Sequence, residues 1–365
     1  MSKQTFGIGI IGCGMIAHFH AKAIAAMEGA EVVACFERNP ERGQEFGETY
    51  GCQAYAELDD MLANPAVDVV TICTPSGAHM DPAIAAAKAG KHILVEKPVD
   101  VSIDKIDAMI AAAEENNVQL ASILPRRFNG GTIKLKEAVE SGRFGQLSLI
   151  EAVTKWYRTQ EYYDSGAWRG TWALDGGGAL MNQSIHTIDL LLNVAGEVDS
   201  VCAFADLLAH ENIEVEDTAV AILNFKNGAK GIIQGSTACY SEEGHAAEVN
   251  ICGVNGSAFL KDDKFTHWEF REEQAGDKEF MNEFGFDPDA GGAGAADPSA
   301  IDFSWHQKNF EEVLDAIREG RKIPADAYEG RKSVELIQAI YQSALNGGAK
   351  VTLPLEKAPE LRSFR

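Results

Sequence analysis

A glycine-rich turn near the start of the chain constrains the fold more than any other feature. Residues 6–12 form a short apolar run bounded by glycines, which is typical of a buried strand, and residues 15–27 repeat apolar side chains at helical spacing. Between them lies Gly12-Cys13-Gly14-Met15-Ile16-Ala17, which fits GxGxxG/A in the strand–turn–helix context that this pattern requires. Gly12 allows the tight turn, and Gly14 lets the backbone approach a pyrophosphate bound at the helix N-terminus. The pattern therefore predicts a dinucleotide-binding βαβ unit.

The rest of the front third continues the alternation of strands and helices. Strands are predicted at residues 31–36, 67–73, 92–95 and 118–124, and helices at residues 78–89 and 102–116, with a further helix opened by Asn39 and Pro40. Strands that alternate with helices of this length indicate a parallel, doubly wound sheet. The sequence therefore predicts an α/β Rossmann domain over residues 1–124.

The remainder, residues 125–365, predicts a second domain of α+β type. Helical patterns cover residues 132–141, 177–194 and much of 300–346, and alternating strand patterns cover residues 198–205, 218–225, 229–237, 247–252 and 257–260. Asn227-Gly228 and Asn255-Gly256 are hairpin-turn signals, so we expect an open, largely antiparallel sheet with helices on one face. The C-terminal helices could pack back on the first domain. The Gly/Ala-rich residues 287–299 are either a surface loop or a lid.

An acidic residue at the end of the second predicted strand bears on the choice of cofactor. Glu37 lies 23 residues beyond Gly14, where an acid binds the hydroxyls of the adenosine ribose. A carboxylate there would repel a 2′-phosphate, so NAD is favoured, while the adjacent Arg38 leaves NADP possible. The candidate cofactor-binding residues are Gly12, Gly14, Met15, Ile16, Glu37, Arg38, Thr74, Pro75, His79, Glu96 and Lys97.

Glu96-Lys97-Pro98 follows the predicted strand at residues 92–95 and carries the first candidate catalytic residue. Ligands of such sheets bind outside the carboxyl ends of the strands. Lys97 could hydrogen-bond a substrate hydroxyl or relay its proton; the alternative is a solvated lysine. Pro98 could follow a cis peptide bond, which the sequence leaves open.

The run Gly176-Gly177-Gly178 opens a predicted helix that carries the second candidate. Asn182 and His186 are four residues apart and therefore share a helix face. Histidine is a natural general base for a hydroxyl proton near neutral pH, although a lone histidine on a helix can also be structural. The three glycines permit close approach of a ligand, and Asp189 could orient the His186 ring or cap a neighbouring group.

An aromatic and basic stretch, residues 156–170, predicts either a carbohydrate surface or a packed aromatic cluster. Aromatic faces stack on sugar C–H groups, and arginine donates to hydroxyl, carboxylate or phosphate oxygens. The candidate substrate-binding residues are Asn182, Arg126, Tyr157, Arg158, Trp168 and Arg169. His306, just beyond the Gly/Ala-rich segment, could also reach the site.

Composition excludes several classes of function. Lys plus Arg total 32 and Asp plus Glu total 55, so the formal charge is −23, which disfavours nucleic acid and anionic membranes as partners. No apolar run of about 18 residues is present to span a bilayer. The seven scattered cysteines form no CxxC pair, which predicts a reducing, cytoplasmic setting. No cluster of Cys and His ligands is evident, so no metal is expected.

Together the GCGMIA turn, the Glu-Lys-Pro tripeptide and the glycine-led helix with His186 resemble the Gfo/Idh/MocA oxidoreductases along the whole chain. The resemblance implies a Rossmann domain that binds NAD(P) and a C-terminal domain whose open sheet often forms the interface of a homodimer or homotetramer. It implies hydride transfer between nicotinamide and a secondary hydroxyl of a sugar, cyclitol or sugar derivative. Lys97 and His186 would be the catalytic residues by motif match.

One departure from the family pattern concerns Asn182, where many members carry Asp. An amide cannot take a proton, so base chemistry would fall on His186, or on Lys97 with a water. The Asn form resembles sugar-nucleotide and pyranoside 3-dehydrogenases. Two alternatives stay open: an NAD-dependent glycoside hydrolase or lyase that oxidises C3 transiently, and a non-catalytic NAD-linked sensor.

Overall fold

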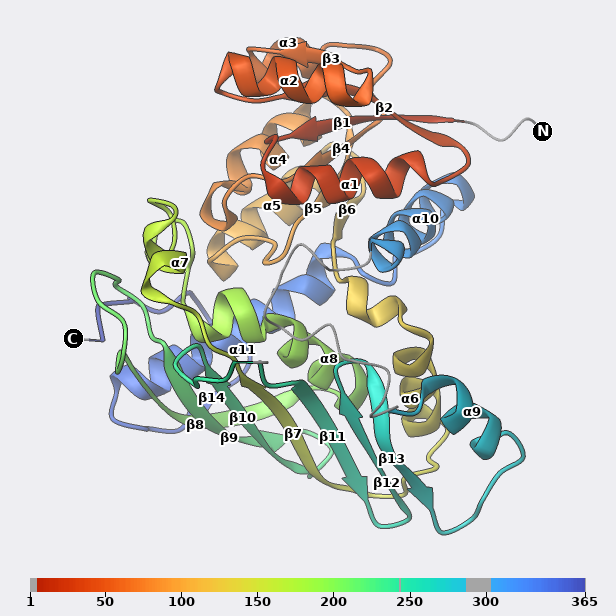
Figure 1. Ribbon diagram of the computed structural model, residues 1–365, viewed down its shortest axis with the longest axis vertical. Coiled ribbons are helices and arrows are strands. Elements are labelled where there is room, and N and C mark those ends of the chain that lie inside the picture. Colours follow the sequence, from red (N-terminus) through yellow and green to blue (C-terminus); the bar gives the residue numbers. More distant parts are fainter. Residues whose placement is uncertain (1–4, 243, 287–302, 365) are drawn as a thin grey trace. The chain divides into compact units, whose positions relative to one another are not determined.

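The computed structural model describes residues 5–242, 244–286 and 303–364. It divides the chain into two compact units (Figure 1): unit 1 comprises Met1–Pro125 and Asp302–Arg331, and unit 2 comprises Arg126–Ile301 and Lys332–Arg365. The segment 287–299, and with it the question of a lid, lies outside the described residues. No helix of the described chain is both long and apolar enough to cross a membrane.

Unit 1 is built on a six-stranded parallel sheet in the order β3-β2-β1-β4-β5-β6. The strands are β1 (Phe6–Ile11), β2 (Ala30–Phe36), β3 (Gln53–Tyr55), β4 (Val69–Ile72), β5 (His92–Val95) and β6 (Leu120–Ser122). The order reverses between β1 and β4, which is the switch point where doubly wound sheets bind ligands. The Rossmann prediction is confirmed.

Helices on unit 1 follow the predicted alternation, except that α3 was not predicted, and the late helix α10 joins this unit. They are α1 (Met15–Ala25), α2 (Pro40–Tyr50), α3 (Leu58–Leu62), α4 (Met80–Lys88), α5 (Ile103–Glu115) and α10 (Ser304–Glu319). As predicted, Asn39 caps α2: its Oδ1 accepts the N–H of Arg42 at 3.2 Å. The late helix α10 packs against α1 and contributes Phe310, Val313 and Leu314 to one buried core with Ile8.

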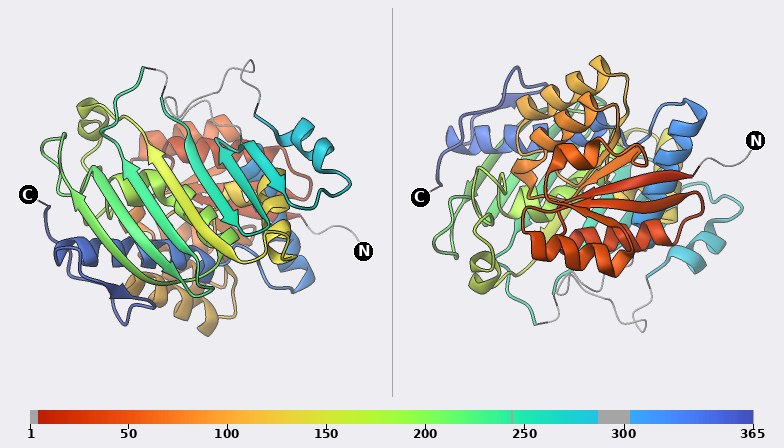
Figure 2. Two further views of the ribbon diagram at one scale, coloured as in Figure 1. Left: turned by 90° about the horizontal axis from the view of Figure 1, so that it is seen from below. Right: turned by 90° about the horizontal axis from the view of Figure 1, so that it is seen from above.

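Unit 2 is built on an eight-stranded mixed sheet in the order β13-β12-β11-β7-β10-β9-β8-β14 (Figure 2). The strands are β7 (Leu147–Lys155), β8 (Val198–Asp206), β9 (Thr218–Phe225), β10 (Lys230–Ser236), β11 (Ala247–Gly253), β12 (Gly256–Lys261), β13 (Lys264–Phe270) and β14 (Val351–Thr352). Only the β7–β10 pair is parallel among these neighbours, so the sheet is largely antiparallel, as predicted.

The helical segments of unit 2 cover one face of this sheet. They are α6 (Gly130–Glu140), α7 (Gln160–Asp164), the π-helix η3 (Ala179–Ser184), α8 (Ile185–Ala195), α9 (Asp277–Phe284) and α11 (Ala327–Leu345), the last of which begins in unit 1. Helix α8 packs on β7 and β11. On the other face Phe204 of β8 pairs with Val220 of β9, and both are exposed.

The structure differs from the sequence predictions in several elements. Strands β3, β7, β13 and β14 had no predicted counterpart, and β7 is the parallel partner of β10. The predicted helix over residues 177–194 begins as the π-helix Ala179–Ser184 and only then becomes the α-helix α8. Such π segments are rare and often lie at functional sites.

Candidate active site

The turn after β1 has the geometry that a dinucleotide phosphate needs. Gly12 has φ +89°, and a Cβ there would lie 3.1 Å from the backbone of Cys73, so the turn admits only glycine without strain. Gly14 caps α1, and no atom lies within 4 Å of the position that its Cβ would take. The N-terminus of α1 therefore has open space where an anion can approach the helix N–H groups.

Glu37 stands at the end of β2, where the ribose of a bound NAD is expected. Its Oε2 accepts the N–H of Cys13 at 3.0 Å, and its Oε1 accepts from the Asn39 N–H at 3.1 Å and from Arg42 Nη2 at 2.8 Å. Burial alone would raise the pKa of this carboxyl, but these donors lower it, so Glu37 stays ionised. Arg38 is exposed, and residues 37–42 line an open surface hollow.

Thr74, Pro75 and His79 lie in the segment that follows β4. His79 is 1% exposed; its Nε2 lies 2.9 Å from the Thr74 carbonyl and its Nδ1 lies 2.9 Å from the Pro98 carbonyl. Both ring nitrogens thus contact backbone, so the His79 ring joins the segment after β4 to the segment after β5. Any effect on a cofactor would pass through those carbonyls.

Lys97 is presented by a segment that is otherwise buried. From Ile93 to Val101 every residue is buried except Lys97, which is half-buried. The Lys97 N–H donates to Glu96 Oε2 at 2.9 Å, and the Lys97–Pro98 peptide bond is cis. Lys97 is therefore the one partly exposed side chain between Ile93 and Val101.

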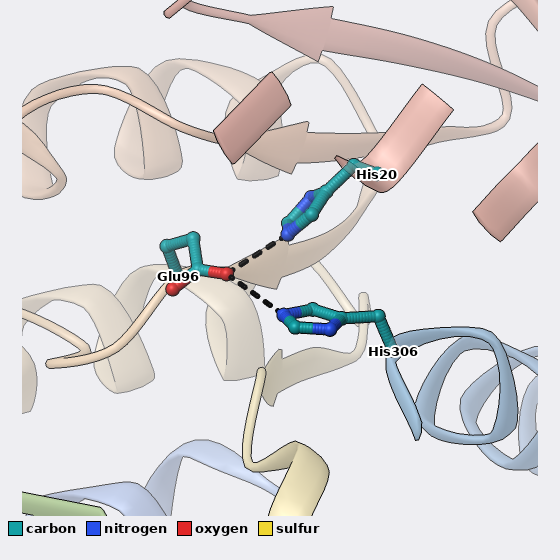
Figure 3. Close-up of side chains that lie close together, drawn as sticks. All are labelled: His20, Glu96 and His306. Carbon is teal, nitrogen blue, oxygen red and sulfur yellow. Dashed lines mark hydrogen bonds and ion pairs between the residues drawn. The ribbon is translucent and has the colours of Figure 1, made fainter. Parts of the chain in front are cut away.

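Glu96 is held between two histidines from distant parts of the chain (Figure 3). Its Oε1 lies 2.9 Å from Nε2 of His20 on α1 and 3.8 Å from Nε2 of His306 on α10. All three side chains are buried. Burial opposes both charges, yet the pairing lowers the pKa of Glu96 to about 2 and, with Cys73, raises that of His20.

His306 was a candidate from sequence, whereas His20 was not. A signal for His20 exists: it lies on the same face of α1 as Ala17, Ala21 and Ile24, all of which are fully buried. A polar side chain on a buried face needs a buried partner. That signal predicts a partner but does not name it, because Glu96 is 76 residues away.

In unit 2, the π-helix and α8 present two side chains from a buried segment. From Asp175 to Leu191 every residue is buried except Asn182 and His186, which are half-buried. Asp189, four residues after Ile185 on α8, accepts two hydrogen bonds from Arg127, from Nε at 2.8 Å and Nη2 at 2.7 Å.

A buried carboxylate also holds the start of the π-helix. Glu216 accepts the N–H groups of Gly178 at 3.0 Å and Leu180 at 2.8 Å, and the hydroxyl of Tyr341 at 3.0 Å. Burial raises the pKa of Glu216 to about 7, against the opposing effect of these donors. A Cβ on Gly178 would lie 1.9 Å from the Glu216 carbonyl oxygen, so only glycine fits there.

The aromatic and basic stretch, for which a carbohydrate surface or a packed aromatic cluster was predicted, forms a connected cluster of aromatic rings and guanidinium groups. Arg169 stacks over the rings of Tyr162, at 4.2 Å, and Trp168, at 4.6 Å. Arg158 stacks over Tyr162 at 5.5 Å and donates to Gln183 Oε1 at 2.9 Å. This cluster, called here the Arg158/Arg169 cluster, also includes Trp156.

Hydrogen bonds through Gln183 connect the Arg158/Arg169 cluster to Asn182. Gln183 donates to the Tyr162 hydroxyl at 2.9 Å and to Asn182 Oδ1 at 3.1 Å, and Asn182 donates to Asp175. Gln183 and Asp175 were not among the predicted site residues, because nothing local in the sequence separates them from ordinary polar residues.

Tyr157 and Arg126 lie elsewhere in unit 2. Tyr157 is 39% exposed and packs edge-on against Tyr240 at 5.3 Å. Arg126 makes a two-point pair with Asp263, with Nε–Oδ1 at 3.0 Å and Nη2–Oδ2 at 2.8 Å. Binding of a substrate by Arg126 would require that this pair break.

Two family models together match most of the chain. The model of the oxidoreductase family with an NAD-binding Rossmann fold matches residues 6–123, and the Gfo/Idh/MocA C-terminal domain matches residues 132–259. The chain belongs to the Gfo/Idh/MocA oxidoreductase family. It is an NAD-dependent dehydrogenase, and the open phosphate turn and ionised Glu37 fit that cofactor. The predictions of family, enzyme class and NAD are confirmed.

Individual relatives act on different compounds. Myo-inositol 2-dehydrogenase of Thermotoga maritima is 31% identical over 273 residues, which cover 73% of this chain and 78% of the relative. Levoglucosan dehydrogenase of Pseudarthrobacter phenanthrenivorans is 24% identical, with 93% and 96% covered. The crystal structure of the WlbA dehydrogenase from Bordetella pertussis in complex with NADH and UDP-GlcNAcA is 33% identical, with a TM-score of 0.87 and 98% and 100% covered.

Proposed function

We propose that this protein oxidises a secondary hydroxyl of a sugar, cyclitol or sugar derivative, with Lys97 and His186 handling the hydroxyl proton. The observation that carries the proposal is the burial pattern. Lys97 is the one partly exposed side chain between Ile93 and Val101. Between Asp175 and Leu191, only His186 and Asn182 are partly exposed. The relatives named above, which include dehydrogenases of inositol and levoglucosan, support the substrate class.

The proposed chemistry assigns a role to each side chain. Bound NAD supplies the acceptor for the hydride that leaves the carbinol carbon, so a ketone forms. The hydroxyl proton passes to neutral His186, whose imidazole is suited to this near neutral pH. The Lys97 ammonium donates a hydrogen bond to the same oxygen. Asn182 cannot accept a proton, so we assign it an orienting role, which its bond to Asp175 supports.

The Arg158/Arg169 cluster supports a substrate that carries a carboxylate or phosphate. Burial, and to a smaller degree the charge of Arg169, lowers the pKa of Arg158, so two cations lie close enough to repel. An anion between them would relieve that repulsion, and arginine binds carboxylates and phosphates through two donors. The Trp168 ring, over which Arg169 stacks, would pack on the sugar. The WlbA relative, crystallised with UDP-GlcNAcA, supports an acidic or nucleotide-linked sugar.

The test is absorbance at 340 nm with NAD⁺ or NADP⁺ across a panel of free pyranoses, inositols, uronic acids, glycosides and UDP-sugars. We expect sustained NADH production, strongest with an acidic or nucleotide-linked sugar. Lys97→Met and His186→Gln should each lower kcat by about 100-fold or more while NADH binding is retained. Lys88→Met, which changes an exposed lysine of α4, is the matched control.

Other outcomes would redirect or refute the proposal. Full activity of Lys97→Met would remove Lys97 from the mechanism. Cleavage of a chromogenic glycoside without net NADH would indicate redox-assisted glycoside cleavage instead. Arg169→Ala should raise KM for an acidic substrate by about 10-fold or more and leave a neutral one little changed. An equal effect on both substrates would contradict the anion-binding role.

The exposed face of the unit 2 sheet supports a homodimer or homotetramer. Phe204, Val220 and Ile222 are 62%, 49% and 64% exposed on adjacent strands, and Ile222 lies beside Ile232. A contiguous apolar face of this kind is typical of an interface, and a second copy of the chain fits a flat self-complementary sheet. Light scattering should show that Ile222→Glu converts the oligomer to monomers. A wild-type monomer would refute the assignment.

The cysteines support a cytoplasmic location. All seven are free in the structure. Free thiols persist in a reducing compartment, so we propose the cytoplasm.

A further inference from the structure

We propose that His20 and His306 are positioning residues for Lys97. Together with Glu96 they form a buried cluster that anchors the Lys97 backbone. The two histidines also neutralise the Glu96 carboxylate, which lies next to the Lys97 ammonium. The inference rests on the proposed function, in which Lys97 contacts the substrate hydroxyl. Its three members come from α1, from the end of β5 and from α10, all within unit 1 (Figure 3).

Both oxygens of Glu96 are used. Oε2 accepts the N–H of Lys97 at 2.9 Å, and Oε1 accepts from His20 Nε2 at 2.9 Å. The carboxylate is therefore a bridge between the cofactor-binding helix and the backbone of the candidate catalytic residue. A bond to the N–H of Lys97 fixes where the side chain begins, so a shift of Glu96 would shift the lysine.

We take His20 as an imidazolium, because its Nε2 lies 2.9 Å from the buried Glu96 carboxylate and its pKa is raised. Nε2 faces the Glu96 carboxylate, and Nδ1 lies 2.8 Å from Thr71 Oγ1 and 3.3 Å from Cys73 Sγ. When the ring is protonated, Nε2 donates to the carboxylate and Nδ1 donates to the Thr71 hydroxyl oxygen, so both charges of the pair are satisfied. The Phe310 ring closes the remaining side, edge-on at 5.2 Å, so water does not solvate the charge there. A buried carboxylate is then paired with a buried cation.

His306 extends the pair into a three-member cluster. Its Nε2 lies 3.8 Å from the same Glu96 oxygen, and its ring lies 5.7 Å from that of His20. The charged or titratable groups that act on Glu96 are His20, His306 and Lys97, and Cys73 faces His20 from the end of β4. His306 is thus a second, weaker source of positive charge at this carboxylate.

The cluster has a direct consequence for Lys97. An uncompensated buried carboxylate would attract the ammonium of the neighbouring lysine and hold it away from a substrate. The His20 imidazolium offsets that attraction, because opposite charges at hydrogen-bond distance largely cancel at longer range. Since α1 also begins at the phosphate turn, the same contact links the position of bound cofactor to that of Lys97.

A metal ion is the rival occupant of this cluster. Within the described residues, His20, Glu96 and His306 are the group whose ligand atoms lie within 4.8 Å of one another, and two imidazoles with a carboxylate is a known zinc ligand set. An imidazolium cannot ligate a metal, so a protonated His20 paired with Glu96 and a metal bound by the cluster exclude each other. The proposal therefore expects activity that is independent of metal.

The test compares His20→Gln, His306→Gln and Glu96→Gln in the full-length enzyme. His18→Gln is the matched control, because it removes a histidine of the same helix whose Nδ1 bonds Tyr50 at 2.9 Å rather than Glu96. The readouts are NADH affinity, KM, and kcat as a function of pH. The pH limb that belongs to Lys97 is identified by its absence in Lys97→Arg, because arginine does not titrate in this range.

The expected result is a loss of kcat by about 10- to 100-fold in His20→Gln and Glu96→Gln, with NADH affinity nearly unchanged, since small displacements of reacting groups cost this much. In His20→Gln the high-pH limb of the kcat–pH profile should move up by about one pH unit. The reason is that an unpaired Glu96 carboxylate favours the protonated form of the Lys97 amine. In Glu96→Gln the limb should move down. His306→Gln should follow His20→Gln with a smaller effect, and it serves as the primary variant where His20→Gln does not fold.

Several results would overturn the proposal. A lower melting temperature with unmoved pH limbs in the His variants would show a purely structural role. Stoichiometric zinc in the purified protein, or loss of activity on chelation, would assign the cluster to a metal. Activity of Lys97→Met would instead defeat the proposed function itself, so the two failures are distinguishable.

Discussion

Substitution of Gly14 by alanine separates cofactor binding from folding. Gly14 has φ −81° and ψ −173°, a conformation that any residue adopts, and no atom lies within 4 Å of the added Cβ. The substitution introduces no clash in the protein alone. Because alanine restricts the unfolded chain, the free energy of unfolding should rise by about 0.4–1 kcal/mol.

The same methyl group should hinder NAD. It would occupy the open space at the N-terminus of α1, where the backbone must approach the pyrophosphate. We expect the Kd for NADH to rise by about 10- to 100-fold, which corresponds to roughly 1.4–2.8 kcal/mol. Calorimetric titration measures the Kd, and thermal melts with and without NADH should show that the ligand-induced rise in Tm is largely lost.

Gly12→Ala is the matched control, since it also adds one methyl group to the turn. At φ +89°, with the new Cβ 3.1 Å from Cys73, it should destabilise the protein by about 1–3 kcal/mol in the absence of NADH. Two results would refute the reasoning about Gly14: wild-type affinity for NADH in Gly14→Ala, or a fall in its Tm without NADH as large as that of Gly12→Ala.

Two further predictions concern buried charges. Arg127→Met breaks the buried two-point pair with Asp189 and should lower the free energy of unfolding in urea by about 3–5 kcal/mol. Arg331→Met breaks the more exposed pair with Asp107 and should lower it by under about 1 kcal/mol. Similar losses in the two variants would contradict the burial argument. The raised pKa of Glu216, about 7 against 4.5 in the unfolded chain, means that its ionisation weakens folding as pH rises through this window. The difference in Tm between wild type and Glu216→Gln (wild type minus variant) should therefore decrease as the pH is raised from 5 to 8. A constant difference would show that Glu216 does not titrate in this range.

Much of the candidate site could be predicted from sequence because its signals are local. The phosphate turn needs two glycines between a strand and a helix, and the structure gives Gly12 a positive φ and Gly14 open surroundings. Glu37, Lys97 and His186 each stand at a fixed distance from a recognisable element. Patterns within about 25 residues carry this information, and no long-range contact is needed to interpret them.

The features that sequence did not predict depend on contacts between distant segments. His20 and Glu96 are 76 residues apart, and Arg127 and Asp189 are 62 residues apart. Strand β7 contains Ser148 and Glu151 among its apolar residues, so its place beside β10 and β11 follows from pairing rather than from its own pattern. The π-helix likewise requires Glu216, which lies well beyond it in the chain.

The two candidate catalytic segments are supported in the same way. In unit 1 the buried carboxylate of Glu96 accepts the N–H of Lys97, and in unit 2 the buried carboxylate of Glu216 accepts the N–H groups of Gly178 and Leu180 at the start of the segment that carries His186. A carboxylate that bonds backbone fixes the path of a segment whatever side chains the segment presents. Rigid support of this kind holds a reactive group to the small tolerances that catalysis needs.

Under the proposed function, the two carboxylates would support reactivity and the Arg158/Arg169 cluster would set substrate choice, with the Arg158–Gln183 bond as the link between them. Neither carboxylate contacts the Arg158/Arg169 cluster through the hydrogen bonds described, and that cluster lies on the strand end, short helix and loop over residues 156–169. Loop residues can change without disturbing the backbone that holds Lys97 or His186. Substitutions at Arg169 or Trp168 should therefore act on KM and on the choice between acidic and neutral sugars, while substitutions at Glu96 or Glu216 should act on kcat for every substrate alike.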